Sequence, residues 1–340
     1  MKKFLSLVLA LVMTMSLVTV SAGAKDFTDS SKINYSEAVD VMSAAKVIDG
    51  YAEGDFRPTN TLTRGAAAKI ICNLILGPTT ASALVADAAP YKDVPTNHTF
   101  AGYIAYCQKE GIISGYADGT FRPAASLTGY AFMKMLLGAL GYDAEVEQYT
   151  GANWSINVAK RALNIGLDDD LVGDFNGVKA VNREEACLYA LNTLTADMVE
   201  YDAKTTVSTN GTTVVIAGSK AKEMVNNGNS DGKVFDKDGV MQFAEKYFDN
   251  LSVKTGSDEF ERPANVWKLK AEEIGTYTNT PDATYTKKVE VGDIYKDLGL
   301  GSKIEKKDVS VYVDGVANAS QPAYAITKGD DTNKYGDNGV

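Results

Sequence analysis

The sequence has little of the chemistry that most metal proteins and enzymes use. Its 340 residues include three cysteines, two tryptophans and one histidine. Cys72, Cys107 and Cys187 are too few and odd in number for a disulfide framework, and no pair has metal-ligand spacing. Each lies in an apolar helical pattern, so we expect small buried residues. No metal site or Ser-His pair can be assembled around His98, and no pair of carboxylates or nucleophile-base set stands out among the 44 acids. We therefore expect no metal, no cofactor and no enzyme activity.

An excess of basic residues is also missing. Lysine and arginine number 34 against 44 aspartates and glutamates, which gives a formal net charge of -10. Nucleic-acid binding depends on Lys and Arg contacts to phosphates, so this balance argues against a nucleic-acid partner. It is compatible with a soluble or lattice-forming surface protein.

Long apolar runs are confined to the N-terminus. Lys2 and Lys3 precede an apolar stretch from Phe4 to about residue 17, and residues 22–24 read Ala-Gly-Ala. This order is typical of a secretory signal peptide, and the stretch is shorter than the ~20 residues of a spanning helix. We expect residues 1–24 to be cleaved, leaving 32 basic and 44 acidic residues, a net of -12, and no membrane span.

One segment of twenty residues occurs twice. Residues 50–69 read GYAEGDFRPTNTLTRGAAAK and residues 115–134 read GYADGTFRPAASLTGYAFMK, with 11 of 20 positions identical at an offset of 65. Self-similarity at a fixed offset indicates one supersecondary unit stacked to build a common core.

Each copy predicts a helix, a glycine-containing turn and a second helix. Apolar residues recur at helical spacing on both sides of the turn, and we expect the first helices to end at Gly50 and near Gly115. Within the turn a glycine permits positive φ, an aromatic ring points inward and a proline delays the second helix. These residues are Gly54, Phe56 and Pro58 in the first copy, and Gly119, Phe121 and Pro123 in the second.

A third, weaker copy follows in residues 149–200. Ile156, Ala159 and Leu163 mark its first helix, while its turn lacks the shared GY-x-DG-x-F-x-P core. Its second helix opens at Asn182, and Glu185 three residues later predicts a capping box. Because two short helices cannot bury a sizeable core, we expect modules at 25–85, 86–148 and 149–200 to pack as one pseudo-threefold, mainly α body.

The composition changes after residue 201. Residues 205–217 are rich in β-branched residues around Asn210-Gly211, which predicts a hairpin. Strand-like segments recur at 285–291 and 309–313, and a helix is expected within 240–248. We therefore expect residues 201–340 to be a β-rich surface region, and the polar C-terminus suggests the first part of a longer one.

The start of the second helix carries the most informative side chains. Thr63-Arg64 and Asn182-Arg183 each place a capping residue before an arginine at the first helical position. A cation there is unfavourable for the helix, so helix stability gives no reason for it. Free helix amides beside a guanidinium form an anion site. Alternatively, the arginine pairs with a nearby acid such as Glu184.

The repeats resemble S-layer homology modules, the wall-anchoring units of bacterial surface proteins, over roughly residues 25–200. The doubled GY-x-[DE]G-x-F-R-P carries the likeness. The family's second helix typically starts with Ile/Leu-Thr-Arg-Ala-Glu. Residues 62–64 read Leu-Thr-Arg and residues 181–185 read Val-Asn-Arg-Glu-Glu, whereas residues 127–129 read Leu-Thr-Gly, without the arginine. The resemblance implies that Arg64 and Arg183 help hold an acidic, often pyruvylated sugar of a secondary cell-wall polysaccharide linked to peptidoglycan, in grooves between modules.

Three aromatic residues are further candidates for sugar contact. Trp154 precedes the first helix of the third copy, and Tyr51 and Tyr116 follow the repeat glycines. Aromatic faces stack on sugars, but core packing explains these residues equally well. The candidate polysaccharide-binding residues are Thr63, Arg64, Asn182, Arg183, Trp154, Tyr51 and Tyr116.

The leading hypothesis is a non-enzymatic anchor in the extracellular cell wall or S-layer, which binds anionic wall polysaccharide through several weak grooves. A second hypothesis is that the modules anchor an exported hydrolase whose catalytic domain lies beyond residue 340 or within 205–340. A third is self-association into a surface lattice through the β-rich region.

Overall fold

The fold was analysed in a computed structural model that describes residues 27–202, 205–209, 212–216, 220–259, 262–281 and 296. The expected signal peptide, the strand-like segments at 285–291 and 309–313, and the turn Asn210-Gly211 lie outside these residues. The helical part contains a 3-10 turn and six helices, namely η1 (Ser30–Lys32), α2 (Ser36–Ala44), α3 (Arg64–Ser82), α4 (Ala101–Lys109), α5 (Gly129–Ala139), α6 (Trp154–Asn164) and α7 (Arg183–Thr195).

Short strands follow, as the change in composition predicted. They are β1 (Val199–Glu200), β2 (Thr205–Thr209), β3 (Thr212–Ile216) and β4 (Lys222–Glu223), then helix α8 (Phe243–Tyr247), then β5 (Leu251–Ser257), β6 (Pro263–Leu269) and β7 (Glu272–Thr278). Strands β2 and β3 form the expected antiparallel hairpin, with Thr209 opposite Thr212. Strands β5, β6 and β7 form a sheet in that order. The predicted fold class, helical and then β-rich, is confirmed.

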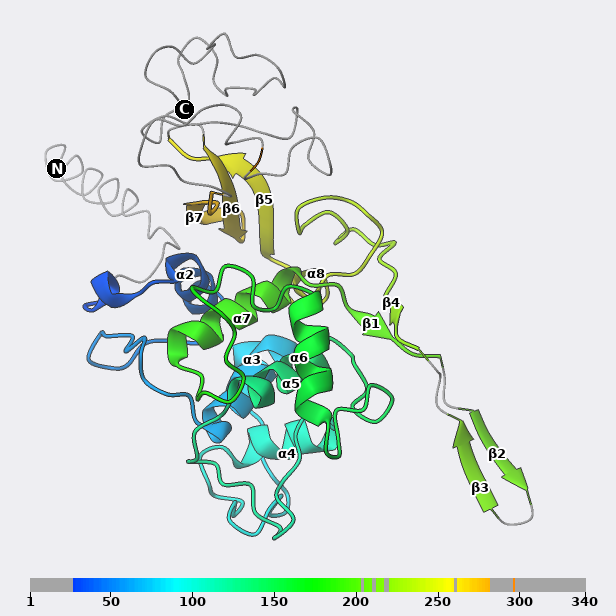
Figure 1. The fold of residues 1–340 in the computed structure, drawn as a ribbon. Coiled ribbons are helices and arrows are strands. Elements are labelled where there is room, and N and C mark those ends of the chain that lie inside the picture. Colours follow the sequence, from blue (N-terminus) through cyan, green and yellow to red (C-terminus); the bar gives the residue numbers. More distant parts are fainter. Residues whose placement is uncertain are drawn as a thin grey trace, which may run out of the picture. The chain divides into compact units, whose positions relative to one another are not determined.

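The six repeat helices pack in a closed cycle within one compact unit (Figure 1). The first helix of each copy packs on the second helix of another copy, giving the pairs α2 with α7, α4 with α3, and α6 with α5. The second helices α3 and α7 also contact α5. No copy therefore buries its apolar faces alone. The boundaries of the three modules stay predictions.

A ring of backbone hydrogen bonds joins the copies just before their second helices. The amide of Leu62 donates to the carbonyl of Val181 at 2.8 Å, and that of Val181 donates to Leu127 at 2.9 Å. Leu127 closes the ring by donating to Leu62 at 2.9 Å. All three side chains are 2% exposed, so the ring lies in the core. Equivalent bonds at equivalent positions are the local evidence for pseudo-threefold symmetry.

The first helices end earlier than the sequence suggested. Helix α2 ends at Ala44 and α4 at Lys109, several residues before Gly50 and Gly115. Each is followed by a residue with positive φ, Lys46 at 56° and Gly111 at 72°. The left-handed conformation turns the chain out of the helix, so termination occurs there.

The third copy keeps more of the turn than its sequence suggested. Gly173 has a φ of 86°, matching Gly54 at 86° and Gly119 at 82°, and Phe175 follows two residues later as Phe56 and Phe121 do. Helix α6 forms where Ile156, Ala159 and Leu163 predicted it, but these residues are not its buried ones. Ile156 is 66% exposed and Leu163 41% exposed, because the helix buries Val158 and Ala162 instead.

The predicted burial of the three cysteines is confirmed, since all are 0% exposed. In the described part of the chain, none of the helices combines the length and apolar character that crossing a membrane requires.

Candidate functional site

The two candidate arginines occupy equivalent positions at junctions between copies. Arg64, the first residue of α3, donates from Nε to the carbonyl of Phe121 at 2.8 Å and from Nη2 to that of Ser114 at 3.1 Å. Arg183, the first residue of α7, donates from Nε to Phe56 at 2.9 Å and from Nη2 to Asp49 at 2.7 Å. Each guanidinium therefore connects one copy to the turn of the next.

These contacts correct the expectation that free helix amides form an anion site. In α3 the first two amides, of Arg64 and Gly65, donate to the carbonyls of Ala125 and Pro123, both at 2.9 Å. The third amide, of Ala66, donates to Oγ1 of Thr63 at 3.2 Å. Because the adjacent turn occupies these donors, Thr63 acts as a helix cap and the helix terminus offers no free anion site.

Helix α7 repeats this arrangement and confirms the predicted capping box. Oδ1 of Asn182 accepts from the amide of Glu185 at 2.8 Å, and Oε2 of Glu185 accepts from the amide of Asn182 at 3.0 Å. The alternative pairing of Arg183 with Glu184 is wrong. The Glu184 side chain is buried and accepts from the amide and Nδ2 of Asn34 at 2.7 and 3.0 Å.

Each candidate tyrosine ring lies close to two guanidinium groups. The Tyr116 ring centroid is 5.1 Å from Cζ of Arg64 and 4.1 Å from Cζ of Arg122. The Tyr51 ring stands 4.8 Å from Arg183 and 4.0 Å from Arg57. Cations within about 6 Å of a ring face are attracted by its quadrupole. Two of the three junctions thus present the same combination of one aromatic ring and two cations.

Sequence reasoning missed the second cation of each pair. Arg57 and Arg122 belong to the GY-x-[DE]G-x-F-R-P segment, so their recurrence at the 65-residue offset was the available signal. Arg57 is ion-paired with Asp55 and Glu53, and Arg122 with Asp118. Their ionic contacts lie within their own turn, unlike those of Arg64 and Arg183.

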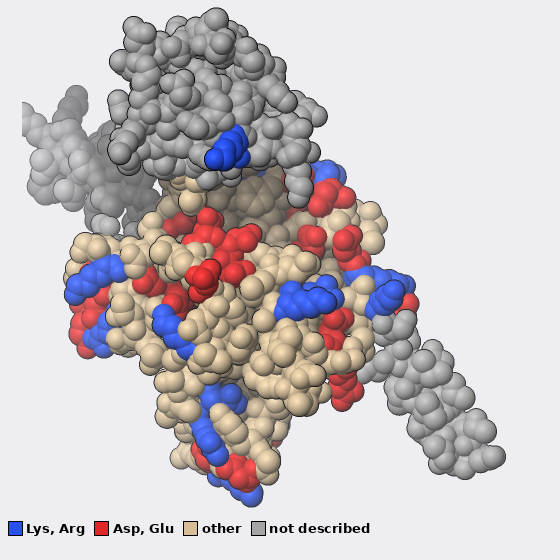
Figure 2. All heavy atoms as spheres, in the orientation of Figure 1, with Lys and Arg blue, Asp and Glu red and all other residues tan. Residues whose placement is uncertain are grey.

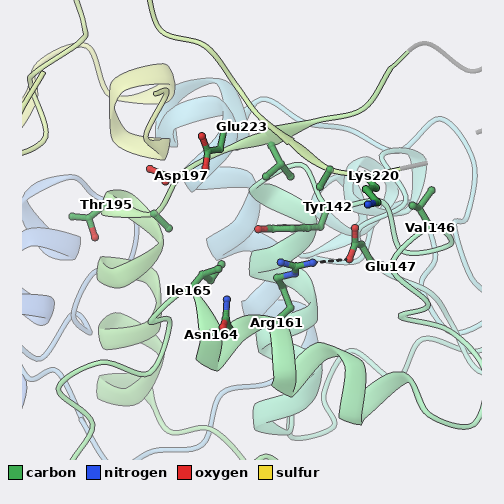
Figure 3. Close-up of a pocket in the computed structure, with 13 residues that line it drawn as sticks. Tyr142, Val146, Glu147, Arg161, Asn164, Ile165, Thr195, Asp197, Lys220 and Glu223 are labelled. Atoms are coloured by element: carbon green, nitrogen blue, oxygen red, sulfur yellow. Dashed lines mark hydrogen bonds and ion pairs between the residues drawn. The ribbon is translucent and has the colours of Figure 1, made fainter. Parts of the chain in front are cut away.

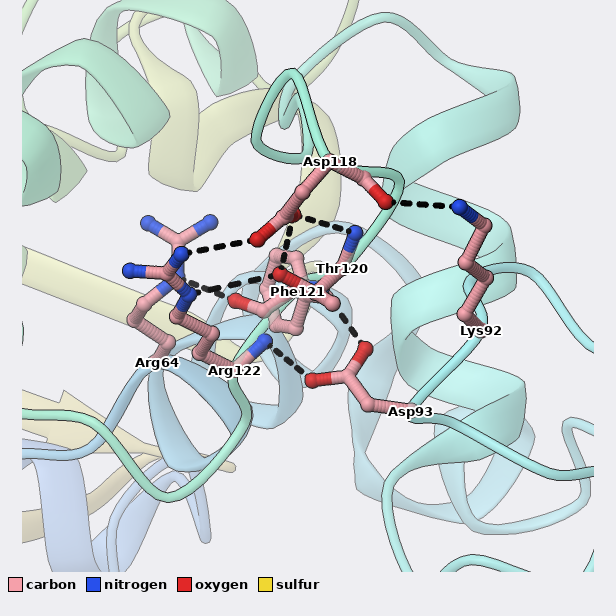
Figure 4. Close-up of polar contacts among 7 residues, drawn as sticks. All are labelled: Arg64, Lys92, Asp93, Asp118, Thr120, Phe121 and Arg122. Atoms are coloured by element: carbon pink, nitrogen blue, oxygen red, sulfur yellow. Dashed lines mark hydrogen bonds and ion pairs between the residues drawn. The ribbon is translucent and has the colours of Figure 1, made fainter.

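An aspartate accepts two backbone amides in the turn of each of the first two copies, and Figure 4 shows the second of these turns. Asp93 accepts the amides of Phe121 and Arg122, both at 2.7 Å, and Asp29 does the same for Phe56 and Arg57 at 2.7 and 2.8 Å. Burial alone raises the pKa of Asp93, but the backbone hydrogen bonds outweigh it and the pKa is lowered. Asp93 therefore holds the turn as an anion. It fixes Arg122 at a φ of 59°, a conformation disfavoured for residues other than glycine.

The second copy's turn has further support. Lys92 donates from Nζ to the Asp118 carbonyl at 2.8 Å. Asp118 accepts from the Thr120 hydroxyl and amide at 2.6 and 2.9 Å and from Arg122, and these hydrogen bonds lower the pKa of Asp118 to about 2. Figure 4 places the Arg64 and Arg122 guanidiniums on the same side of this turn. Hydrogen bonds to this turn hold both the Arg64 and the Arg122 side chains in place.

A cavity of about 420 Å³ adjoins Arg64 and Tyr116 and is also lined by Trp154 and Lys134. Nζ of Lys134 lies 5.7 Å from the Trp154 ring, and burial lowers the Lys134 pKa. Three candidates from three copies, Arg64, Tyr116 and Trp154, therefore meet at one site. Tyr51 and Arg183 form the second site, at another junction.

The third junction differs because glycine replaces the arginine. A Cβ on Gly129 would lie 3.1 Å from Cα of Gly177 and 3.2 Å from the Phe175 ring. The neighbouring Tyr130 ring packs edge-on against Phe175 and Trp154, with centroids 5.8 and 6.4 Å apart. Aromatic packing thus takes the place of the guanidinium here.

A larger cavity of about 790 Å³ lies elsewhere in the helical unit (Figure 3). Arg161 faces Glu147 in an ion pair of 3.2 Å, and the Tyr201 hydroxyl donates to Glu147 at 2.8 Å. Asp197, Glu223 and Lys220 also line this cavity. Arg161 is the one arginine among the described residues that line this cavity, so the cavity lacks the two neighbouring guanidinium groups of the junction sites.

The surface has no single dominant charge on the face shown in Figure 2, where basic and acidic groups are interspersed over the described residues. In the described part of the chain, no group of three or more His, Cys, Asp or Glu side chains could hold a metal ion. The paired cations at the two junctions are thus the most distinctive polar feature of the helical body.

Packing of helix pairs from three copies, with arginines and tyrosines at two of the junctions, defines a body built from repeats. The S-layer homology domain family matches residues 26–68 and 90–129, within the first two copies. The protein is therefore an S-layer homology domain-containing protein of the bacterial cell surface.

Curated relatives agree with this assignment. The chain is 25% identical to a surface layer protein of Brevibacillus choshinensis over 96% of its own length and 32% of that protein. It is 35% identical to a cellulosome-anchoring protein of Acetivibrio thermocellus over 31% of this chain and 24% of that protein. The chain is also 26% identical to an uncharacterized cell wall amidase of Bacillus anthracis, over 51% of this chain and 32% of that protein. The chain spans at most about a third of the length of these relatives.

Proposed function

We propose that the three modules anchor the protein noncovalently to the cell wall by binding an anionic secondary cell-wall polysaccharide linked to peptidoglycan. The observation that carries the proposal is the repeated placement of Tyr51 and Tyr116, each close to two guanidinium groups at a junction. An aromatic face suits the apolar side of a sugar ring, and guanidinium groups suit a carboxylate. A pyruvate ketal presents both features on one residue.

The donors available to such a ligand follow from the contacts already made. In Arg64 and Arg183, Nε and Nη2 are engaged by carbonyls, while Nη1 has no partner among the described residues. The carbonyl contacts fix each guanidinium, so its remaining edge is preorganised for a ligand and little side-chain entropy is lost on binding. Arg122 and Arg57 supply a second cation close to the same ring.

Two sites on one rigid body explain the retention of a surface protein by weak contacts. When one site is occupied, the second binds the same polymer at a high effective concentration, and overall affinity rises by 10²–10⁴ without any new contact. The Gly129 junction has no corresponding cation, so we assign binding to the Arg64 and Arg183 junctions. Thr63 and Asn182 belong to these sites as helix caps, and Trp154 belongs to the Arg64 site.

We further propose that the protein is not itself an enzyme and that residues after about 205 begin a surface-exposed portion that self-associates into a lattice. Surface layer proteins among the relatives support this view. The similarity to a cell wall amidase supports the other candidate, an anchored hydrolase. Sequence beyond residue 340 distinguishes the two, since a domain with a catalytic set of residues favours the hydrolase.

The test is sedimentation of the full chain with purified walls, before and after removal of the acidic polymer, and after mild acid removal of pyruvate ketals. Arg57→Ala and Arg122→Ala are the sharpest variants, because these side chains make their ion pairs within their own turn. We expect each to weaken binding roughly 5- to 30-fold, about 1–2 kcal/mol, which is less than a shielded charged hydrogen bond contributes because the Arg57 and Arg122 side chains are partly exposed. The double variant should lose retention.

Lys160→Ala removes an equal charge from an exposed position on α6 and serves as the matched control. Equal binding of Arg57→Ala, Arg122→Ala and Lys160→Ala would reject the two junction sites. Unchanged binding to walls without the acidic polymer would reject the ligand class.

A further inference from the structure

Two of the three cysteines lie against each other across a helix interface. Cys72 is on α3 and Cys107 on α4, and their Sγ atoms are 3.6 Å apart. Both residues are 0% exposed. The helices come from different copies, so this contact spans the junction between the first and second modules.

The local contacts fit a pair of thiols more closely than two unrelated apolar side chains. Cys72 Sγ lies 3.5 Å from the Tyr103 carbonyl, and Cys107 Sγ lies 3.6 Å from the Ala68 carbonyl. A disulfide bond is about 2.05 Å long, so less than 2 Å of sulfur movement separates the contact from a bond. No third Cys, His, Asp or Glu joins them as a metal-binding group in the described residues.

We propose that Cys72 and Cys107 form a disulfide that crosslinks α3 to α4 in the exported protein. The location outside the cell provides an environment where disulfides persist. The crosslink closes a loop of 35 residues along the chain, from position 72 to 107, which restricts the unfolded state. The inference rests on the surface location and is independent of polysaccharide binding.

The oxidant is an external disulfide, either a small molecule or a protein thiol–disulfide oxidoreductase. The thiolate of one cysteine attacks this disulfide, forms a mixed disulfide and releases one external thiolate. The second cysteine, as its thiolate, attacks the mixed disulfide, forms the Cys72–Cys107 bond and releases the other external thiolate. The protein loses two electrons and two protons, and the external disulfide is reduced to two thiols.

Burial determines when this exchange takes place. The neighbouring Cys72 sulfur and burial both raise the pKa of Cys107, so its reactive thiolate is suppressed in the folded protein. External reagents also have no access to two fully buried sulfurs. The crosslink therefore forms during folding after export, before α3 and α4 close over the thiols, and is then protected from reduction.

The test is the thiol state of the full-length protein extracted from its native walls in denaturant with N-ethylmaleimide. We expect peptide mass spectrometry to find Cys187 alkylated and the Cys72 and Cys107 peptides joined, with the joined peptide lost after reduction. Cys187 is buried but has no partner cysteine, so it is the internal control. Alkylation of all three cysteines would overturn the proposal.

A second measurement compares melting temperatures with and without reductant. The extracted protein should melt on the order of 10 °C higher than the same protein reduced in denaturant and refolded with reductant. Cys72→Ala should show no response to reductant, while Cys187→Ala should keep the response. A reductant response that persists in Cys72→Ala would contradict the pairing.

Discussion

Replacement of Arg183 by alanine tests whether the junction arginines hold the modules together. Arg183 belongs to α7, and its guanidinium donates to the carbonyls of Phe56 and Asp49 in the first copy's turn. Its removal leaves both carbonyls without these donors and breaks a contact between residues more than 120 positions apart in sequence. The substitution therefore acts on the closure of the threefold cycle.

The magnitude follows from those two hydrogen bonds. A hydrogen bond to a charged group contributes about 1.5–3 kcal/mol when well shielded, and Arg183 is only partly buried, so we take about 1 kcal/mol for each. Removing a cation from a helix N-terminus returns about 0.5 kcal/mol. The net loss is about 1.5 kcal/mol, a decrease in melting temperature of about 3–6 °C for a body of this size.

Calorimetry on the parent, Arg183→Ala and Arg57→Ala measures this directly. Arg57 also lies on the Tyr51 ring, but its ion pairs are to Asp55 and Glu53 in the same turn, so Arg57→Ala should melt close to the parent. Arg183→Lys should recover only part of the loss, since an ammonium lacks the forked geometry that reaches two carbonyls. If Arg183→Ala melts with the parent while wall binding is lost, the arginine serves the ligand alone and the bridging argument is refuted.

Two further predictions concern the turn and the cycle. Asp93→Asn should destabilise the protein at neutral pH, because an amide cannot accept both backbone N–H groups as the carboxylate does. The folded pKa of Asp93 is lowered, so its contribution is present above the unfolded pKa of about 4 and is lost as pH falls through the folded value. The melting difference from the parent should therefore shrink in thermal scans below about pH 4, and a constant difference would contradict this. Deletion of residues 149–200 removes α6 and α7, which exposes the faces of α5 and α2 that pack against them. The shortened protein should therefore lose its cooperative transition in calorimetry. A sharp transition would show that the modules fold independently.

The sequence alone was sufficient for the repeat, the helix pairs and the positions of the arginines. These features depend on local chemistry, since periodic apolar residues, a capping side chain before a helix and a glycine at positive φ act over a few residues. Because the repeat recurs at an offset of 65 residues, the helices and turn predicted in the first copy could be placed in the second copy as well. The capping box at Asn182 and the inward Phe56 and Phe121 follow from the same local rules.

Only the tertiary structure decided what those residues contact. Packing of each first helix on a different copy, the engagement of the helix amides by neighbouring carbonyls, and the carbonyl bridges of Arg64 and Arg183 all join residues far apart in the chain. The same holds for the contact between Cys72 and Cys107, whose 35-residue separation carries no pairing signal. The periodicity of apolar residues predicts that one face of each helix is buried. Which helix packs against that face depends on the packing of the three copies in a closed cycle.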